Sequence, residues 1–514
     1  MNKTIKLAGD LYYSVYVIGV SLMSFVGIYA LYLTYAEKKD KKSNFNLEYY
    51  LAAKGTQSTP RTVYSLIATS LGTWILITPP SFSSYYGILG AVAFAFGSSL
   101  CLAIPAILGP IIQRNSNNAL SLGDYCRQRY GWIGQFYMSA ICLLNIFLSL
   151  VSELTIMGQI FETIVGGNRI FIVVFTCFLT AFYTAFGGLS VSIKTDQVQG
   201  IFSLIAIVIF SLYMAAKFRI DRSIPLPDYL NANKMGAGTL GAHPLGFFGY
   251  MTCNEAFWQR AWASKSPREF RKASLISAII LFIIVFLFGF YGFIEAWQNY
   301  FGVTYNLQLF SIFKDNHPVW ILVILVVLSM IMGEAEIDSF QIAMVSSLST
   351  CFLKNYPLWI TQIMVFLIDI PAIVVSLQNL NMIGVNLVIG LICVSVVPAF
   401  FLGFWKKIQK YHTFVNLVLS SFFGIFFISY WGVRQQHNDT SAGLKYVFYQ
   451  YWGYEPFLIN FVGATVVSLF ISLLHLVLDK TILEKAKKMK TTRDLETEQI
   501  TSKNLFFFNN FFSF

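Results

Sequence analysis

The sequence predicts an all-α polytopic membrane protein with about 13 transmembrane helices arranged as an inverted repeat. Hydrophobic residues make up 56% of the 514 residues and charged residues only 12%, against roughly 25% charged in a soluble domain. Apolar runs of membrane-spanning length recur along the whole chain. Two of them are interrupted by glycine and polar residues, and they begin five spans apart, which indicates two five-helix halves.

An apolar stretch of about 20 residues is long enough to cross a bilayer as a helix. The first stretch is too long for the core of a signal peptide and is expected to remain as a span. We divide the chain into a flanking helix and loop in 1–60, a first repeat in 61–217, a second repeat in 241–410, two flanking helices in 411–480 and a tail in 481–514. The predicted spans are 11–34, 61–80, 85–112, 132–161, 168–186, 193–216, 241–262, 273–297, 319–350, 358–377, 382–405, 412–432 and 456–478.

Basic residues indicate the orientation of these spans. Clusters of Lys and Arg lie in 38–42, 127–129, 260–272, 406–410 and 485–490, and all fall on one side, which the positive-inside rule makes cytoplasmic. We therefore expect the N-terminus outside, the C-terminus inside and the plasma membrane as location. The net charge of +11 comes from these connections and not from a stripe on a soluble domain, so nucleic acid is not an expected partner.

The second and seventh spans differ from ordinary membrane helices. The second carries Gly72, Thr73 and Trp74, and the seventh carries Asn254 and Glu255 among several glycines. Because five spans separate their starts, the second half enters the membrane from the opposite side, as an inverted repeat requires. Broken backbone persists inside a membrane only where it lines a cavity. The two breaks therefore predict a solute site at the midplane; the alternative is that the seventh span is an unbroken amphipathic helix.

Asp196 is a lone carboxylate at the start of a long apolar run, within AFGGLSVSIKTDQVQG. An unpaired charge at the bilayer centre costs roughly 2.5–3.5 kcal/mol on insertion scales. A bound cation would offset that cost and makes solute transport the leading hypothesis. The alternative is that Asp196 lies at the membrane interface and pairs with Lys194.

Two further groups of acidic residues within the predicted spans are candidates for function. Glu153 lies in the middle of the fourth span, where it either faces a solute cavity or bonds to a hydroxyl of a neighbouring helix. Glu334, Glu336 and Asp338 follow an apolar run in the ninth span, with Glu334 and Asp338 on one helix face and Glu336 on another. Buried neighbouring carboxyl groups favour binding a proton, which suits a proton-coupled transporter. The alternative is that the span ends earlier and the cluster faces water.

Three motifs resemble those of the sodium:solute symporter family, whose fold is the inverted repeat of the bacterial leucine transporter with added flanking helices. They are GGLSVSIKTDQVQG from Gly187, SLGDYCRQRYG from Ser121, and FWQRAWASKSPREFRKA from Phe257. The last motif and SLGTW from Ser70 look most like the urea and polyamine permease branch. The resemblance covers roughly residues 11 to 410.

The resemblance implies a sodium ion held by the carbonyls of Ala68 and Leu71 and by a Ser/Thr pair on the ninth span. At the aligned place the chain has Ala335 and Glu336 instead, and a shift of one turn yields no such pair. We therefore expect either sodium at Ala68, Leu71 and Asp196, helped by a carboxylate of the ninth span, or coupling to protons.

Enzyme chemistry is not predicted, because the sequence contains no GxSxG, HExxH or Walker A motif and its seven cysteines stand singly. We predict secondary active symport, by alternating access, of a small polar solute such as urea or a polyamine, with no cofactor beyond the transported Na⁺ or H⁺. The cation-binding candidates are Ala68, Leu71, Asp196, Glu334, Glu336 and Asp338, and the solute-binding candidates are Thr73, Trp74, Glu153, Asn254 and Glu255. The alternatives are a transporter-fold nutrient sensor, a sodium-coupled carrier of a monocarboxylate, amino acid or sugar, and a channel.

Overall fold

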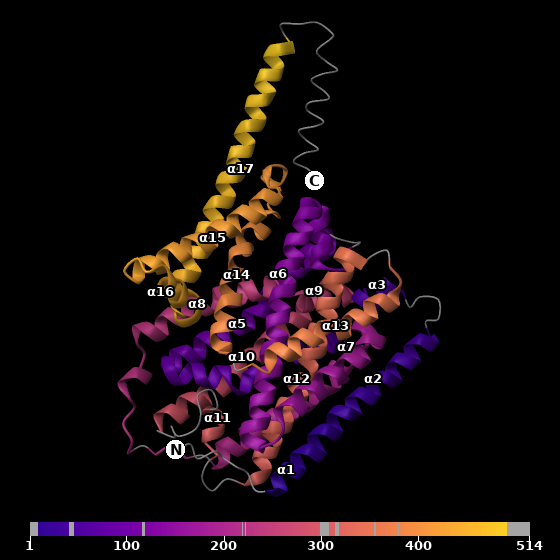
Figure 1. Ribbon diagram of the computed structural model, residues 1–514, viewed down its shortest axis with the longest axis vertical. Coiled ribbons are helices and arrows are strands. Elements are labelled where there is room, and N and C mark those ends of the chain that lie inside the picture. Colours follow the sequence, from indigo (N-terminus) through magenta and orange to yellow (C-terminus); the bar gives the residue numbers. More distant parts are fainter. Residues whose placement is uncertain are drawn as a thin grey trace.

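A computed structural model of the chain describes residues 9–40, 46–115, 119–217, 219–221, 223–298, 308–313, 318–353, 356–378 and 380–490, and it contains helices and no β-strand within these ranges (Figure 1). The predicted all-α class is confirmed. The part of the tail from 491 onward and the basic residues in 41–42 lie outside the described residues. The longer helices are α2 (Ser21–Asp40), α5 (Thr78–Asn115), α6 (Leu122–Ile160), α7 (Arg169–Lys217), α10 (Pro267–Trp297), α12 (Val319–Leu348), α13 (Leu358–Ser376), α14 (Met382–Leu402), α15 (Phe414–Gln435) and α17 (Tyr454–Lys490).

Three of these helices, α5, α6 and α7, have a kink at a glycine. Gly188 divides α7 at φ 64° and ψ −165°, and Gly87 divides α5 at φ 66° and ψ −160°. Glycine adopts this backbone conformation readily because it has no Cβ atom. A side chain at Gly188 would also meet the Tyr50 carbonyl oxygen, 2.6 Å from its Cβ position. The two helical parts of α7, before and after Gly188, therefore correspond to the two predicted spans 168–186 and 193–216.

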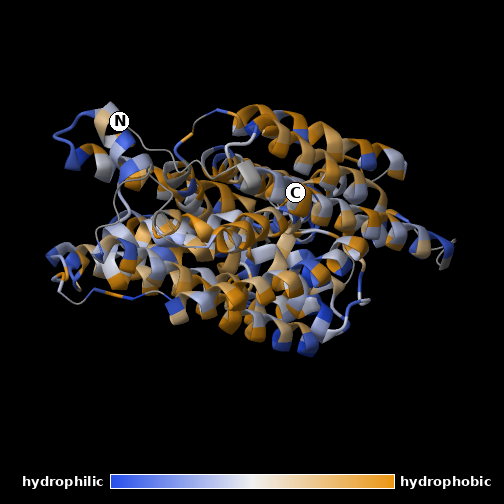
Figure 2. Ribbon diagram, turned by 90° about the horizontal axis from the view of Figure 1, so that it is seen from below, coloured by the Kyte–Doolittle hydropathy of each residue, from blue (hydrophilic) through white to orange (hydrophobic). Residues whose placement is uncertain are grey.

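Within the described ranges, ten helices are long and apolar enough to cross a membrane. This number agrees with the predicted spans, because α7 contains two of them and the two interrupted spans do not qualify: α4 and α9 are too short, and α8 is long enough but not apolar enough. Large apolar side chains remain exposed on the outside of the bundle, for example Leu212 at 65% and Phe422 at 63%. Hydrophobic residues predominate along the helices and hydrophilic ones gather in loops and at helix ends (Figure 2), as expected for a lipid-facing surface.

Both predicted breaks are present. The second span is divided into α4 (Thr59–Ser70), a 3₁₀ turn η2 (Thr73–Leu76) and the start of α5. The seventh span is divided into α8 (Lys234–Thr252) and α9 (Glu255–Ala263). The alternative of an unbroken amphipathic seventh span is therefore wrong. The break falls at Cys253 and Asn254, whereas Pro244 lies inside α8.

The helices around the two breaks form the centre of the molecule. α5 packs against α10 and α8, while α12 packs against α6 and α7. The buried face of α12 is continuous from Leu325 to Ser347. α15 and α17 pack together at the side of this bundle, and α17 projects beyond it (Figure 1).

Candidate functional site

Glu153 of α6 holds the first break in place. One carboxyl oxygen, Oε2, accepts hydrogen bonds from the Thr73 amide at 2.7 Å and from the Thr73 hydroxyl at 2.5 Å. The other oxygen accepts from the Trp74 amide at 3.3 Å. The first amides of a helical turn lack partners within the turn, and a carboxylate satisfies them. The prediction that Glu153 bonds to a neighbouring hydroxyl is confirmed, and Thr73 is that neighbour.

Asn145, two turns earlier on α6, supports the second break. Its side-chain amide donates to the carbonyls of Tyr250 at 3.0 Å and Cys253 at 3.1 Å. The last carbonyls of a helix lack donors, so α6 supplies an acceptor to one break and a donor to the other. Sequence reasoning missed Asn145, although an amide in the middle of an apolar span is a recognisable signal.

A buried cavity of about 130 Å³ opens beside the first break. Among the predicted solute-binding residues, Trp74 and Glu153 line it, together with Glu336 from α12. Most of the remaining wall is aromatic or hydroxyl-bearing, and none of the described lining residues is Lys or Arg. The cavity therefore offers two carboxyl groups and the imidazole of His243, and no Lys or Arg side chain among its described lining.

The two carboxyl groups meet at Gly72. Glu153 of α6 and Glu336 of α12 approach Gly72 from two different helices. A Cβ atom at Gly72 would lie 1.5 Å from Oε2 of Glu336 and 2.7 Å from Oε2 of Glu153. Two carboxylates this close repel each other strongly, so the arrangement favours a proton or a cation between them. The absence of a side chain at position 72 is what lets them converge.

Thr73, Asn254 and Glu255 do not line this cavity. Thr73 is held by Glu153, as described above. The Asn254 side chain caps α9 by accepting from the Ala256 amide at 3.0 Å. Glu255 accepts from the Leu122 amide at 2.8 Å and so caps the start of α6. These residues hold helix ends at the breaks.

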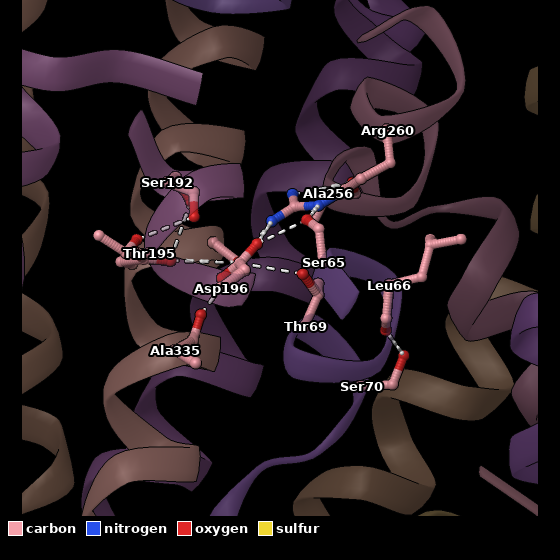
Figure 3. Close-up of polar contacts among 12 residues, drawn as sticks. Ser65, Leu66, Thr69, Ser70, Ser192, Thr195, Asp196, Ala256, Arg260 and Ala335 are labelled. Carbon is pink, nitrogen blue, oxygen red and sulfur yellow. Dashed lines mark hydrogen bonds and ion pairs between the residues drawn. The ribbon is translucent and has the colours of Figure 1, made fainter. Parts of the chain in front are cut away.

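Asp196 is paired with an arginine. Oδ2 of Asp196 lies 3.1 Å from Nη2 of Arg260 and accepts from the Ser65 hydroxyl at 2.6 Å. Both charged side chains are fully buried. Figure 3 shows the Arg260 side chain reaching from α9 to the point where Asp196 and Ser65 meet. The alternative partner Lys194 is wrong, because Lys194 forms an ion pair with Glu37 of α2.

The predicted acidic cluster of α12 is buried, with exposed fractions of 0% for Glu334, 4% for Glu336 and 0% for Asp338. The alternative that it faces water is therefore wrong. Oδ1 of Asp338 accepts from the hydroxyls of Ser192 at 3.1 Å and Ser339 at 3.2 Å. Gln199 approaches Glu334, but no hydrogen bond of ordinary geometry forms and both oxygens of Glu334 stay unbonded.

Ser339 is a second residue that sequence reasoning missed. Its hydroxyl lies 3.2 Å from that of Thr69 and accepts from Nη2 of Arg260 at 2.7 Å. It is three and four residues beyond Glu336 and Ala335, where the sequence comparison placed the expected hydroxyl pair. Within the described ranges, no backbone–backbone hydrogen bond outside the helices ends on the carbonyl of Ala68 or Leu71.

Comparisons with known proteins agree with this architecture. The profile of the sodium:solute symporter family matches residues 49–354. The spermidine transporter DUR31 of Candida albicans is 26% identical over 439 residues, which cover 82% of this chain and 83% of that protein. The urea active transporter of Saccharomyces cerevisiae is 24% identical over 289 residues, or 51% of this chain and 38% of that protein. The probable urea active transporter 1 of Schizosaccharomyces pombe is 22% identical, with 50% and 42% covered.

Two solved structures share the fold. A Na⁺-coupled sialic acid symporter in a substrate-bound outward-open state superposes with a TM-score of 0.69 at 15% identity, covering 90% of this chain and 97% of that one. Mhp1, a nucleobase-cation-symport-1 transporter, superposes in a closed conformation with a TM-score of 0.55 at 12% identity, covering 83% and 93%. The predicted leucine-transporter-type fold is therefore confirmed.

Proposed function

Because the chain belongs to the sodium:solute symporter family, we propose that it accumulates an amine-bearing solute of the polyamine type across the plasma membrane, driven by protons. Membership of the family and the transporter relatives make it an integral membrane protein that carries a small solute. The solute class, the driving ion and the orientation with the N-terminus outside are our proposals.

One observation carries the choice of solute. The cavity beside the first break is lined by Glu153, Glu336, aromatic rings and the imidazole of His243, with no Lys or Arg among its described lining. An ammonium group bound there is attracted by both carboxyl groups and by the face of Trp74. Urea, which is neutral, gains less from such a site. The relative that matches over most of its own length is named a spermidine transporter, and those named urea transporters match over less than half of theirs.

The charged residues Asp196, Arg260, Glu334 and Asp338, which we call the second cluster, favour proton coupling. Arg260 already balances Asp196, so this carboxylate does not need a metal ion for neutrality. Glu334 is fully buried with both oxygens unbonded, and a carboxyl group can bind and release a proton where a hydroxyl cannot. We assign Glu334 as the residue that carries the proton through the cycle.

Sodium coupling is the second candidate, and one observation favours it. Oδ1 of Asp196 and Oδ2 of Asp338 are buried without a hydrogen-bond donor, and hard cations take carboxylate and carbonyl oxygens as ligands. The carbonyls of Ala68 and Leu71 and the Ser339 hydroxyl belong to the same region of α4 and α12.

Uptake of labelled spermidine and urea into proteoliposomes tests the proposal. We expect spermidine to accumulate against its gradient when the external pH falls from about 7.5 to about 5.5, and to do so equally in sodium and in choline buffers. Glu334→Gln should keep spermidine binding and lose the response to pH, whereas the exposed Glu162→Gln should behave like the wild type. Strict sodium dependence with a flat pH profile would favour the second candidate, and binding without accumulation would identify a sensor.

A further inference from the structure

Arg260 is surrounded by oxygen atoms from four helices. Its Nε donates to the Ser65 hydroxyl of α4 at 3.1 Å, and its Nη1 donates to the Ala256 carbonyl of α9 at 3.1 Å. Nη2 donates to Oδ2 of Asp196 in α7 at 3.1 Å and to the Ser339 hydroxyl of α12 at 2.7 Å. Two hydroxyls, one carboxylate and one carbonyl thus surround the guanidinium, and we call this oxygen set the chamber. Figure 3 shows Ser65, Asp196 and Ala256 beside the Arg260 side chain.

This oxygen set is one that a small cation from solution also prefers, since hard cations bind carboxylate, carbonyl and hydroxyl oxygens. The chamber excludes water, because Arg260 is 1% exposed and Asp196 and Ser65 are 0% exposed. A buried anion without a cation is strongly unfavourable. If the guanidinium were removed, the free energy of the site would be lowered by any cation that entered it.

The helix that carries Arg260 is different from the three helices that supply Ser65, Asp196 and Ser339. Arg260 lies on α9, directly after the second break, whereas Ser65, Asp196 and Ser339 lie on three other helices. The far end of α9 is held by backbone bonds from the amides of Gly55 to Trp262 at 3.1 Å and of Gln57 to Ala263 at 2.9 Å. The guanidinium therefore belongs to a short helix whose far end is anchored by these two bonds.

We propose that Arg260 is a resident cation: its guanidinium permanently occupies an oxygen-lined site between α4, α7, α9 and α12, and this site binds a monovalent cation from solution when the side chain is shortened. The inference goes beyond the proposed function, because it concerns cation binding and holds for any solute.

The test compares Arg260→Ala with Arg268→Ala, which removes an exposed arginine from the start of α10. Melting temperature and labelled spermidine uptake are measured in choline, sodium, potassium and guanidinium chlorides at millimolar concentration. We expect Arg260→Ala to lose about tenfold or more of its uptake in choline, which corresponds to about 1.4 kcal/mol, and to regain stability and uptake with sodium or guanidinium. The wild type and Arg268→Ala should not respond.

Two further variants separate a cation site from a structural clamp. Adding Asp196→Asn to Arg260→Ala removes the carboxylate, so the response of melting temperature to cations should disappear. Arg260→Lys keeps a tethered charge and should melt at the same temperature in all four salts. If the Arg260→Ala protein cannot be produced in folded form, the same salt titrations are carried out on Arg260→Gln. A melting temperature that falls equally in every salt would overturn the proposal, and because melting does not depend on transport, this result is distinct from failure of the proposed function.

Discussion

Replacement of Glu153 measures how much the first break depends on one side chain. In Glu153→Ala the Thr73 amide, the Thr73 hydroxyl and the Trp74 amide lose their acceptor. A buried donor left without a partner costs about 1–3 kcal/mol. The bond from the Trp74 amide is long and adds little. The two Thr73 donors therefore determine the loss of stability, which is about 2–6 kcal/mol in total. Because the residue lines a cavity that admits water, we expect the lower part of this range, about 2–3 kcal/mol.

Glu153→Gln should have a smaller effect on stability. The amide oxygen still accepts from Thr73, but the bonds lose the charge that strengthens them, which corresponds to about 1–2 kcal/mol in total. Uptake of a cationic solute should fall more strongly, because one of the two carboxyl groups facing the cavity is gone. The two variants thus separate support of the break from attraction of the solute.

Thermal unfolding of the purified protein in detergent, followed by labelled uptake in proteoliposomes, provides both measurements. Glu162→Gln is the matched control, because Glu162 lies in η3 (Phe161–Val165), which directly follows α6, and is exposed. We expect the melting temperature to decrease in the order wild type and Glu162→Gln, then Glu153→Gln, then Glu153→Ala. A Glu153→Ala variant as stable as the wild type would refute the reasoning, since the break would then not rely on this acceptor.

Three further predictions follow from the same contacts. Gly72→Ala should abolish uptake while protein abundance falls less, because its Cβ would collide with the Glu336 carboxyl; normal uptake would contradict the convergence at Gly72. Gly249→Ala should destabilise the protein, because its Cβ would lie 2.5 Å from the backbone nitrogen of Val394, and a melting curve checks this. Burial lowers the pKa of His412, in the loop before α15, to about 4. Its neutral form therefore stabilises the fold at neutral pH, and this contribution is lost as the pH falls from 6.5 toward 4. His412→Gln should melt with a weaker dependence on pH in that range, and an unchanged slope would contradict the assignment.

Membrane spans and their breaks were predictable because their signals are local. An apolar run of about 20 residues determines a span wherever it stands, and glycine and polar residues at Gly72 and Asn254 weaken the helix at the place where they occur. The family was predictable for the same reason, since its motifs are continuous in sequence. The sequence also indicated that Asp196 needs a partner inside the membrane.

The identity of that partner was not predictable. Arg260 is 64 residues away from Asp196, and the rotation of α9 relative to α7 depends on packing between helices. Lys194, two residues from Asp196, pairs with α2 instead because residues two apart point to different sides of a helix. Ser339 was missed because a pair of hydroxyls was sought, and one turn beyond Ala335 and Glu336 the chain offers only one hydroxyl. Arg260 was assigned to the basic cluster 260–272 of a cytoplasmic connection, and the structure corrects this assignment, because Arg260 is buried and paired with Asp196.

α12 connects the two clusters and explains how solute and ion can influence one another. Glu336 lines the cavity beside the first break, whereas Asp338 accepts from Ser192 of α7 and Ser339 accepts from Arg260 of α9. Residues two apart on a helix lie on different faces, so one rigid element contacts both sites. α4 repeats this connection, because Ser65 bonds to Asp196 and the chain then reaches the Glu153 bonds within ten residues. A displacement of either helix therefore changes the bonding at both sites. If solute binding favours one position of these helices, cation or proton binding in the second cluster must be affected by the same free energy, and the reverse holds equally.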